Sequence, residues 1–343
     1  MAFTERYVTS AAGGGGAGTE GDPWTFAEGL ANGQKGDRVN VKSDAGYSLG
    51  ADAIDNATAP DVINALVYRG YNSSIGDLEG QGRNADGTLN VTNFPVITLT
   101  GQLTTAPFAV LEALSFVGSL SSRLVGGVID HSHMIQCKFV NTANNASAIA
   151  WGCDDSSSLI NCDCECSGAS HGPVADADSA FFASGCRIKG LGGVHLALNH
   201  GTVLDTVIFG NTTGVGIQIR SSTLRTILQN CTIYDVGIAI STPASANLVP
   251  LCMINCHITD CAEYLNNSFS GTQNEWAIEV NNRTRDNTTG RTGIGDGIAV
   301  SEITTDTGGA ETDFVNAGAE NFRLIAAAPG NAAGMVAFDD CGA

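Results

Sequence analysis

The chain has little positive charge, few aromatic side chains and no long apolar run. Its 343 residues contain 16 Lys and Arg against 35 Asp and Glu, which gives a formal net charge of −19, and only 6% are aromatic. Because Lys and Arg are the side chains that bind phosphate groups, this balance argues against nucleic acid or an anionic membrane surface as a partner. No stretch approaches the roughly 18 apolar residues that a membrane-spanning helix needs. The first residues lack a basic start followed by an apolar core, so no signal peptide is expected.

A short phrase recurs through the middle of the chain at intervals of 20 to 25 residues. Each copy begins with a polar residue or glycine, continues with a small residue, and then alternates polar and apolar side chains. The copies lie at 136–139, 161–164, 185–188, 205–208, 230–233 and 255–258. A period of this length indicates stacked repeats, and the alternation, with Gly and Asn between the runs, indicates strands rather than helices. We therefore predict an all-β, single-stranded parallel β-helix, a solenoid in which each coil lies on the one before.

The ends of the chain differ from this repeating middle. Residues 1–22 include four consecutive glycines and are predicted to form a flexible arm. Residues 23–65 are predicted to hold a short capping helix, with Asp22 as its cap and Pro23 in its first turn, and the first strands. Such a helix would cover the open end of the solenoid and its unpaired strand edges. The coils are expected over 66–320 and a closing segment over 321–343.

Cysteine is abundant, with 11 residues. Five of them share one position of the repeat: Cys137, Cys162, Cys186, Cys231 and Cys256. We expect these five to form a column of buried, unpaired thiols, as in a protein that folds in a reducing cytosol. The 162–166 run, with three cysteines at alternate positions, has spacing unlike that of zinc sites and is interpreted as core filling.

Three segments carry a resemblance to known proteins. Residues 18–25 and 36–39 resemble the opening of many proteins of the pectate-lyase-like superfamily. Residues 321–324 and 328–333 look like the common ending of those proteins. The resemblance implies a right-handed parallel β-helix with an N-terminal capping helix. It does not imply one activity, because this scaffold serves lyases, hydrolases, adhesins and bacteriophage fibres, tailspikes and capsid decorations.

The strongest enzymatic pattern is similar to that of polygalacturonases, whose site uses Asn-Thr-Asp, Asp-Asp, Gly-His-Gly and Arg-Ile-Lys in that order. This sequence has 141–143, 154–155, 170–172 and 187–189 at those places. The similarity would make Asp154 or Asp155 the acid and base, about 6.5–9.5 Å apart in an inverting hydrolase. It would make His171 the residue that adjusts the protonation of the two aspartates. Arg187 and Lys189 would bind a uronate carboxylate. Because an alanine stands at 143 where the family needs Asp, no catalytic residue is favoured.

A pectate-lyase-like site would instead need clustered carboxylates for calcium and an arginine base. Asp176 and Asp178, together with Asp154 and Asp155, could hold such a cation. The segment 174–179 is equally well interpreted as an ordinary acidic loop. No cofactor is therefore expected, with Ca²⁺ as the alternative.

The incomplete catalytic patterns, the unpaired thiols and the missing signal peptide favour a non-enzymatic structural virion protein, such as a capsid decoration or fibre. We expect it to be made in the host cytoplasm, to form a homotrimer, to contact the capsid through its N-terminal arm and to bind surface glycans weakly. The alternative is a polysaccharide-degrading β-helix enzyme of the polygalacturonase or pectate-lyase type, located outside the cell. A bacterial adhesin is a third hypothesis, which the missing signal peptide disfavours.

Overall fold

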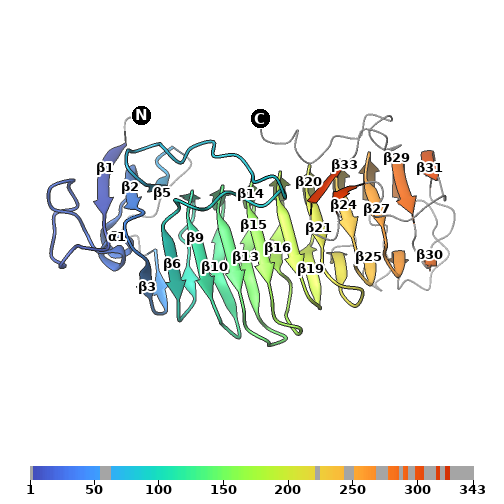
Figure 1. Cartoon of the computed structure of the whole chain (residues 1–343), viewed down its shortest axis with the longest axis horizontal. Helices are drawn as coiled ribbons and strands as arrows, with labels where there is room; N and C mark the ends of the chain where they lie inside the picture. The colour runs from blue at the N-terminus through green and yellow to red at the C-terminus, as the bar shows by residue number, and fades with distance from the viewer. Residues whose placement is uncertain are drawn as a thin grey trace.

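The computed structural model describes residues 3–54, 63–220, 225–242, 251–267, 277–285, 289–292, 298–304, 314–316 and 321–324. Over these residues the chain winds into a parallel β-helix, with strands stacked coil upon coil along one long axis (Figure 1). The predicted all-β, right-handed solenoid is confirmed. Each regular coil contributes three strands, so the body has three sheet faces, named face 1, face 2 and face 3 in the order in which the chain meets them.

Faces 1 and 2 belong to one continuous sheet. Face 1 is formed by β1 (Thr4–Val8), β2 (Asp37–Lys42), β5 (Leu66–Tyr71), β8 (Ala109–Glu112), β11 (His133–Ile135), β14 (Ser158–Ile160), β17 (Phe181–Ser184), β20 (Gly201–Leu204), β23 (Thr226–Gln229) and β26 (Leu251–Ile254). Face 2 is formed by β3 (Tyr47–Leu49), β6 (Val96–Leu99), β9 (Ser115–Gly118), β12 (Lys138–Asn141), β15 (Asp163–Cys166), β18 (Arg187–Gly190), β21 (Val207–Phe209), β24 (Thr232–Tyr234) and β27 (His257–Thr259). The long strand β29 (Ala277–Arg285) continues both faces and pairs with β31 (Ile298–Thr304).

Face 3 is a separate parallel sheet of ten strands. They are β4 (Asp52–Ala53), β7 (Leu103–Thr104), β10 (Arg123–Asp130), β13 (Ile149–Asp155), β16 (Ala175–Ser179), β19 (Val194–Leu198), β22 (Val215–Ile219), β25 (Ile238–Thr242), β28 (Glu263–Asn267) and β30 (Thr289–Thr292). A small antiparallel pair, β32 (Phe314–Asn316) and β33 (Asn321–Leu324), follows the coils. The predicted closing segment otherwise lies outside the described residues.

The recurring phrase of the sequence marks the corner between face 1 and face 2. Its first residue adopts a left-handed backbone conformation, as at Asn161, Asn230 and Asn255, whose φ angles are 52°, 54° and 53°. Asn, Asp and Gly tolerate this conformation best, and it turns the chain sharply between two strands. The next residue points into the core, and in the six copies it is a buried cysteine or threonine. The repeat therefore encodes the bend of each coil together with its filling.

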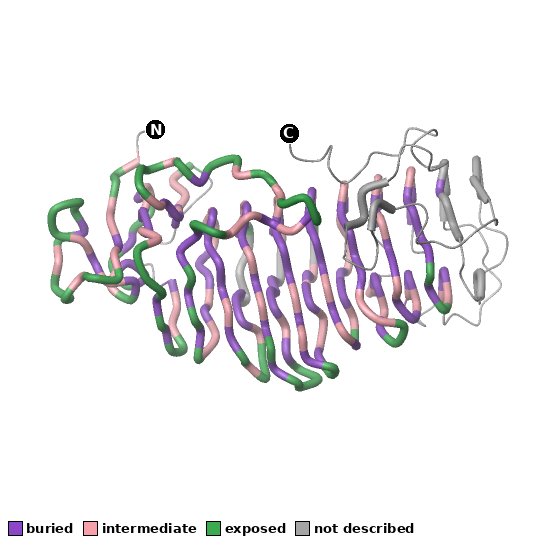
Figure 2. The backbone as a smooth tube through the Cα atoms, viewed as in Figure 1, coloured by how far each residue is buried: buried purple, intermediate pink, exposed green. Residues whose placement is uncertain are grey.

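The core is a narrow column of aliphatic, aromatic and thiol side chains that runs through the coils. Figure 2 shows buried residues recurring in coil after coil. The five cysteines of the repeat are at most 1% exposed, and the described cysteines are all free, which confirms the predicted thiol column. Their thiols donate to backbone carbonyls of the preceding coil; the Cys137 Sγ lies 3.3 Å from the Leu111 oxygen. Burial raises the pKa of Cys137 to about 12, so the thiol stays protonated. These cysteines are packing residues.

The N-terminal end is more ordered than the sequence suggested. Strand β1, within the predicted flexible arm 1–22, pairs in parallel with β2, and Val8 is fully buried. Helix α1 (Phe26–Asn32) is the predicted capping helix, but it begins after Thr25 rather than at Asp22. The reason is a reciprocal capping box, in which the Thr25 side chain accepts from the Glu28 amide and the Glu28 carboxylate accepts from the Thr25 amide.

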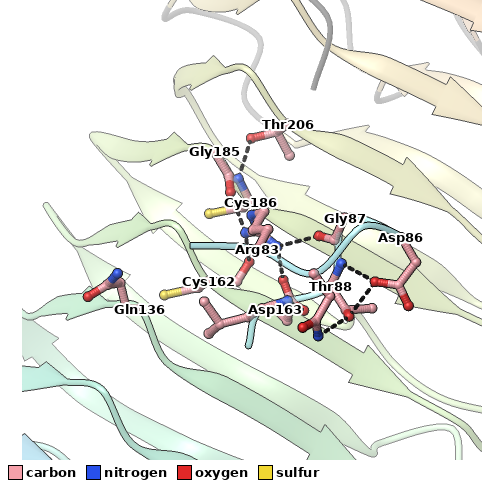
Figure 3. A network of polar contacts seen from close by, with 12 residues as sticks. Arg83, Asp86, Gly87, Thr88, Gln136, Cys162, Asp163, Gly185, Cys186 and Thr206 are labelled. Atoms are coloured by element: carbon pink, nitrogen blue, oxygen red, sulfur yellow. Dashed lines mark hydrogen bonds and ion pairs between the residues drawn. The ribbon is translucent and has the colours of Figure 1, made fainter. Parts of the chain in front are cut away.

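A strap, defined as residues 72–95 between β5 and β6, runs along the outside of the coils at the corner between faces 1 and 2 (Figure 1). Its apolar side chains Leu78, Leu89 and Phe94 form a small cluster of their own against Ala113. Figure 3 shows how Arg83 fixes it: the guanidinium contacts the Asp163 carboxylate at 2.5 Å and the Gly185 carbonyl at 2.5 Å. The strap therefore connects successive coils.

No helix in the described part of the chain is long and apolar enough to cross a membrane.

Candidate functional site

The outer surface of face 3 carries a row of small and polar residues at one register position. Going along the coils, the row consists of Gly126, Gly152, Asp176, Ala197, Gln218, Ser241 and Asn266. The residues before and after them, such as Trp151 and Cys153 on β13, point into the core. Alternation along the strands thus places a track on the outer side of this sheet, in which Gly126, Gly152 and Ala197 are buried and Asp176, Gln218, Ser241 and Asn266 are partly exposed.

Asp176 is the charged centre of this track. Arg220, just after β22, brings its Nη1 atom to 2.6 Å from Asp176 Oδ1. From the other side, Arg123 at the start of β10 places Nη2 at 3.6 Å from Asp176 Oδ2. The carboxylate is thus held between two guanidinium groups that come from coils on opposite sides of β16. The side chains of Asp176, Arg123 and Arg220 retain 13%, 22% and 33% of their exposure, so the cluster is reachable from solvent.

Small residues on the intervening coils leave space for this cluster. Gly152, on the coil between Arg123 and Asp176, has no side chain, and a Cβ built there would lie 2.5 Å from Arg123 Nε. On the coil between Asp176 and Arg220 the matching residue is Ala197. Adjacent coils are about 4.8 Å apart, so each arginine reaches across roughly two coils, which its long side chain can do only over small neighbours.

Asp178 extends the cluster along the same strand. Its Oδ1 lies 3.7 Å from the same Arg220 Nη1 atom, and 48% of its side chain is exposed. The sequence left 174–179 open between an acidic loop and a cation site. In the structure this stretch forms β16, with Ala175 and Ala177 buried and both aspartates on the outside. Two carboxylates and two guanidinium groups therefore meet on one exposed surface.

This arrangement can recognise an anionic sugar. Guanidinium groups bind carboxylates through two parallel hydrogen bonds, and Arg220 and Arg123 are held ready by the carboxylate between them. A bound uronate would place its own carboxylate near these groups and its ring over the neighbouring small residues of the track, Gly152 and Ala197. Asp178 is the more exposed of the two carboxylates, with 48% of its side chain exposed against 13% for Asp176, so it lies where a bound sugar would meet it.

The polygalacturonase-like set predicted as an alternative is spread over two sheets. Asp154 and Asp155 end β13 on face 3, although their side chains lie outside the described part. Arg187 and Lys189 stand on β18 of face 2, where Arg187 is 5% exposed and stacks at 4.4 Å on the Phe209 ring. Lys189 pairs with Glu165 at 3.7 Å on the neighbouring strand. The structure therefore does not bring the two cations to the sheet that carries the two aspartates.

His171, the remaining member of that set, lies in the turn from face 2 to face 3. It is 4% exposed, its Nδ1 donates to the Gly172 carbonyl at 2.5 Å, and its Nε2 accepts from the Gly192 amide at 3.0 Å. The ring packs edge-on against His195 of the next coil, 6.1 Å away. Both nitrogens are engaged by backbone, and burial lowers the pKa of His171. In this structure His171 holds the turn.

The Ca²⁺ alternative stays a prediction, because the side chains of Asp154 and Asp155, half of the proposed carboxylate set, lie outside the described ones. Among the described side chains, no three His, Cys, Asp or Glu residues gather as a metal cluster. The carboxylate that would anchor such a site, Asp176, contacts Arg220 and Arg123. Calcium favours six to eight oxygen ligands, and a carboxylate flanked by two guanidinium groups is a poor start for such a shell.

Sequence reasoning did not identify Arg123 and Arg220 as site residues. Arg220 lies 44 residues after Asp176, far beyond any local motif. The available signal was the repeat itself: residues separated by two coils on one face approach each other across the sheet. To use that signal, one must know which residues of neighbouring strands on face 3 lie opposite each other. The repeating phrase lies at the corner between faces 1 and 2, and the turns from there to face 3 vary in length, so the phrase does not determine this register.

No known family model and no curated protein sequence matches the chain. Solved structures do. Pectate lyase Pel9A matches with a TM-score of 0.58 and 11% identity over 96% of this chain and 91% of its own. A rhamnogalacturonan lyase matches with a TM-score of 0.50 and 10% identity over 91% of both chains. The alginate lyase AlyGC of family PL6 matches with a TM-score of 0.51 and 10% identity over 84% of this chain and 40% of its own.

At these identities the likeness establishes the fold: a parallel β-helix with structural neighbours in the pectate lyase superfamily. It also corrects the main functional prediction. The expected non-enzymatic virion protein is wrong, because these structural neighbours are polysaccharide lyases and none of them is a virion component. The prediction rested on incomplete catalytic patterns, unpaired thiols and the missing signal peptide, and none of these three features excludes an enzyme.

Proposed function

We propose that the chain is a polysaccharide lyase that cleaves a uronate-containing polysaccharide bound along the outer track of face 3. The observation that carries the proposal is the cluster in which Arg123 and Arg220 flank Asp176, with all three side chains partly exposed on the outer side of face 3. The three lyases that share the fold support the reaction class. The length of the track, from Gly126 to Asn266, suits a chain of several sugar units rather than a single small molecule.

In the proposed reaction, Arg123 and Arg220 bind the uronate carboxylate and neutralise its charge. Neutralisation makes the hydrogen on the adjacent ring carbon more acidic, because the negative charge that develops in the transition state spreads onto that carboxylate. Asp178 accepts the proton. The electron pair of the broken C–H bond forms a carbon–carbon double bond, and the glycosidic oxygen leaves and takes a proton from water. Asp176 keeps the two guanidinium groups in place.

The test is a cleavage assay with the full chain on polygalacturonate, rhamnogalacturonan and alginate. Elimination produces an ultraviolet-absorbing double bond at the new chain end, whereas hydrolysis produces reducing ends without that absorbance. We expect absorbance to appear with at least one substrate. Arg220→Gln should lower kcat/KM on the order of 100-fold or more, as loss of an oxyanion-stabilising donor does.

Arg38→Gln is the matched control. It removes the same charge from β2, where Arg38 pairs at 3.3 Å with the exposed Glu5, far along the chain from the site. This variant should retain the wild-type rate. No cleavage of any uronate polymer, or an unchanged rate in Arg220→Gln, would rule out the proposal. Reducing ends without new absorbance, lost in Asp154→Asn and Asp155→Asn, would instead favour the hydrolase alternative.

A further inference from the structure

The outer surface of face 1 differs chemically from the other two faces. On face 2 and face 3 the outward residues include charged pairs, such as Lys189 with Glu165 and Arg220 with Asp176. On face 1, from β11 to β26, the described outward strand residues include no Asp, Glu, Lys or Arg. They form two rows in register: His133, Ser158, Phe182, Thr202, Ile227 and Cys252, and Ile135, Ile160, Ser184, Leu204, Gln229 and Ile254.

Apolar side chains dominate these rows, and they retain access to solvent. Phe182, Ile135, Ile160, Leu204, Ile227, Cys252 and Ile254 are all partly exposed, whereas their inward neighbours, such as Met134 and Leu159, are 0% exposed. Burial lowers the pKa of His133, the one titratable imidazole in the rows, so at neutral pH this side chain is uncharged as well. The face therefore presents a neutral, mainly apolar strip.

The size of the strip suits the centre of a protein interface. Six coils at about 4.8 Å each, with outward rows spaced by about 7 Å along the strands, give a strip roughly 25 to 30 Å long and 10 Å wide. Monomeric soluble proteins rarely expose contiguous apolar patches larger than a few hundred Å², and this strip, at roughly 250 to 300 Å², reaches that size. A stable interface buries about 800 Å² per partner, with an apolar core and a polar rim. The polar corner residues beside the strip, such as Asn230 and Asn255, would supply that rim.

We infer that a second copy of this chain packs against face 1 through this strip. Two features favour a copy over an unrelated partner. The coil spacing is identical in both molecules, so ridges and grooves of one strip match those of the other along its whole length. In addition, a chain with a net charge of −19 repels its own kind, and this neutral strip is where two copies approach with the least repulsion.

The first measurement is the native mass by light scattering on a sizing column, over a range of concentrations. The single chain has a mass of 35.2 kDa, and the wild type should show twice that mass or a higher multiple. Ile160→Lys places a charge in the strip without touching the core and should shift the mass to that of one chain. Val140→Lys makes the matching change on face 2, at a partly exposed apolar position, and should keep the wild-type mass.

Cys252 provides an independent readout, because it lies within the strip and is the only described cysteine that is not buried. In a Cys341→Ser background, alkylation of Cys252 should be several-fold slower in the wild type than in Ile160→Lys. Circular dichroism checks that the variant is folded, and Leu204→Lys replaces it if it is not. A wild type of 35.2 kDa at every concentration, or equal alkylation rates in folded variant and wild type, would overturn the inference. Neither result depends on enzymatic activity.

Discussion

At the scale of single residues, His195 is a buried side chain whose two ring nitrogens both face backbone carbonyls. It is fully buried near the start of strand β19 on face 3, with Nδ1 2.9 Å from the Val215 carbonyl and Nε2 3.1 Å from the Gly190 carbonyl. A neutral ring carries one N–H and can donate to only one of them. Burial nevertheless dominates and lowers the pKa of His195 to about 4, although the two carbonyls oppose the shift.

This lowered pKa predicts acid sensitivity. An unfolded histidine titrates near pH 6.5, so between about pH 6.5 and 4 the unfolded state binds more protons than the folded one. Stability should be full above pH 6.5 and fall on the order of 3 kcal/mol as the pH drops to about 4. Urea unfolding midpoints across this range would measure the loss. His195→Gln should flatten the curve, whereas His200→Gln, at a partly exposed position, should not. An equally steep curve in His195→Gln would contradict the assignment.

Individual residues also show what the sequence could and could not predict. The recurring polar-then-small phrase predicted the coils and the thiol column because each phrase contains both determinants of its bend: a residue that tolerates left-handed φ and a side chain small enough for the corner. The cluster of Arg123, Asp176 and Arg220 could not be predicted in this way. Its members share no local pattern and meet only through the stacking of strands.

At the scale of elements, the strap is a segment whose contacts with the coils could not be predicted from the sequence. Its composition is that of a polar loop, and its partners are distant in the chain: Asp163 lies 80 residues from Arg83, and Gly185 lies 102 residues away. The Asp163 carboxylate also accepts from the Leu89 amide at 2.8 Å, and its side chain is only 7% exposed. One buried carboxylate thus fixes the strap at two points, at Arg83 and at Leu89.

We expect Arg83→Met to destabilise the fold by about 3 kcal/mol, because it leaves the buried Asp163 carboxylate without its cation. Asp163→Asn in the same background should restore part of that loss, since a neutral amide is less costly to bury. Urea unfolding of the two single variants and the double variant forms a double-mutant cycle that measures the coupling. Arg38→Gln, a surface arginine with an exposed partner, should cost less than about 1 kcal/mol. Additive losses in the cycle would show that the two residues are not coupled.

At the scale of the whole molecule, the three faces divide the chemistry of the protein among them. Face 1 presents a neutral strip, face 2 carries ion pairs and the strap along its edge, and face 3 carries the track with its arginine cluster. Only the stacking of coils creates these surfaces, because consecutive strands of the chain lie on different faces. The predicted homotrimer and the predicted absence of nucleic-acid and membrane partners stay predictions, since the structure contains a single chain.

The overall charge gives the proposed activity a distinctive salt dependence. A body with a net charge of −19 repels a uronate polymer at long range, while Arg123 and Arg220 attract its carboxylates only at contact. Raising the ionic strength from about 0.01 M to 0.1 M shortens the Debye length from roughly 30 Å to 10 Å, so the repulsion is screened before the contacts are. We therefore expect KM to fall several-fold over this range and to rise again at higher salt. A neutral polysaccharide, tested for binding under the same conditions, should show no such minimum. A KM that rises steadily from the lowest salt would mean that attraction by the site reaches beyond the acidic body, and the charge argument would then have to be reversed.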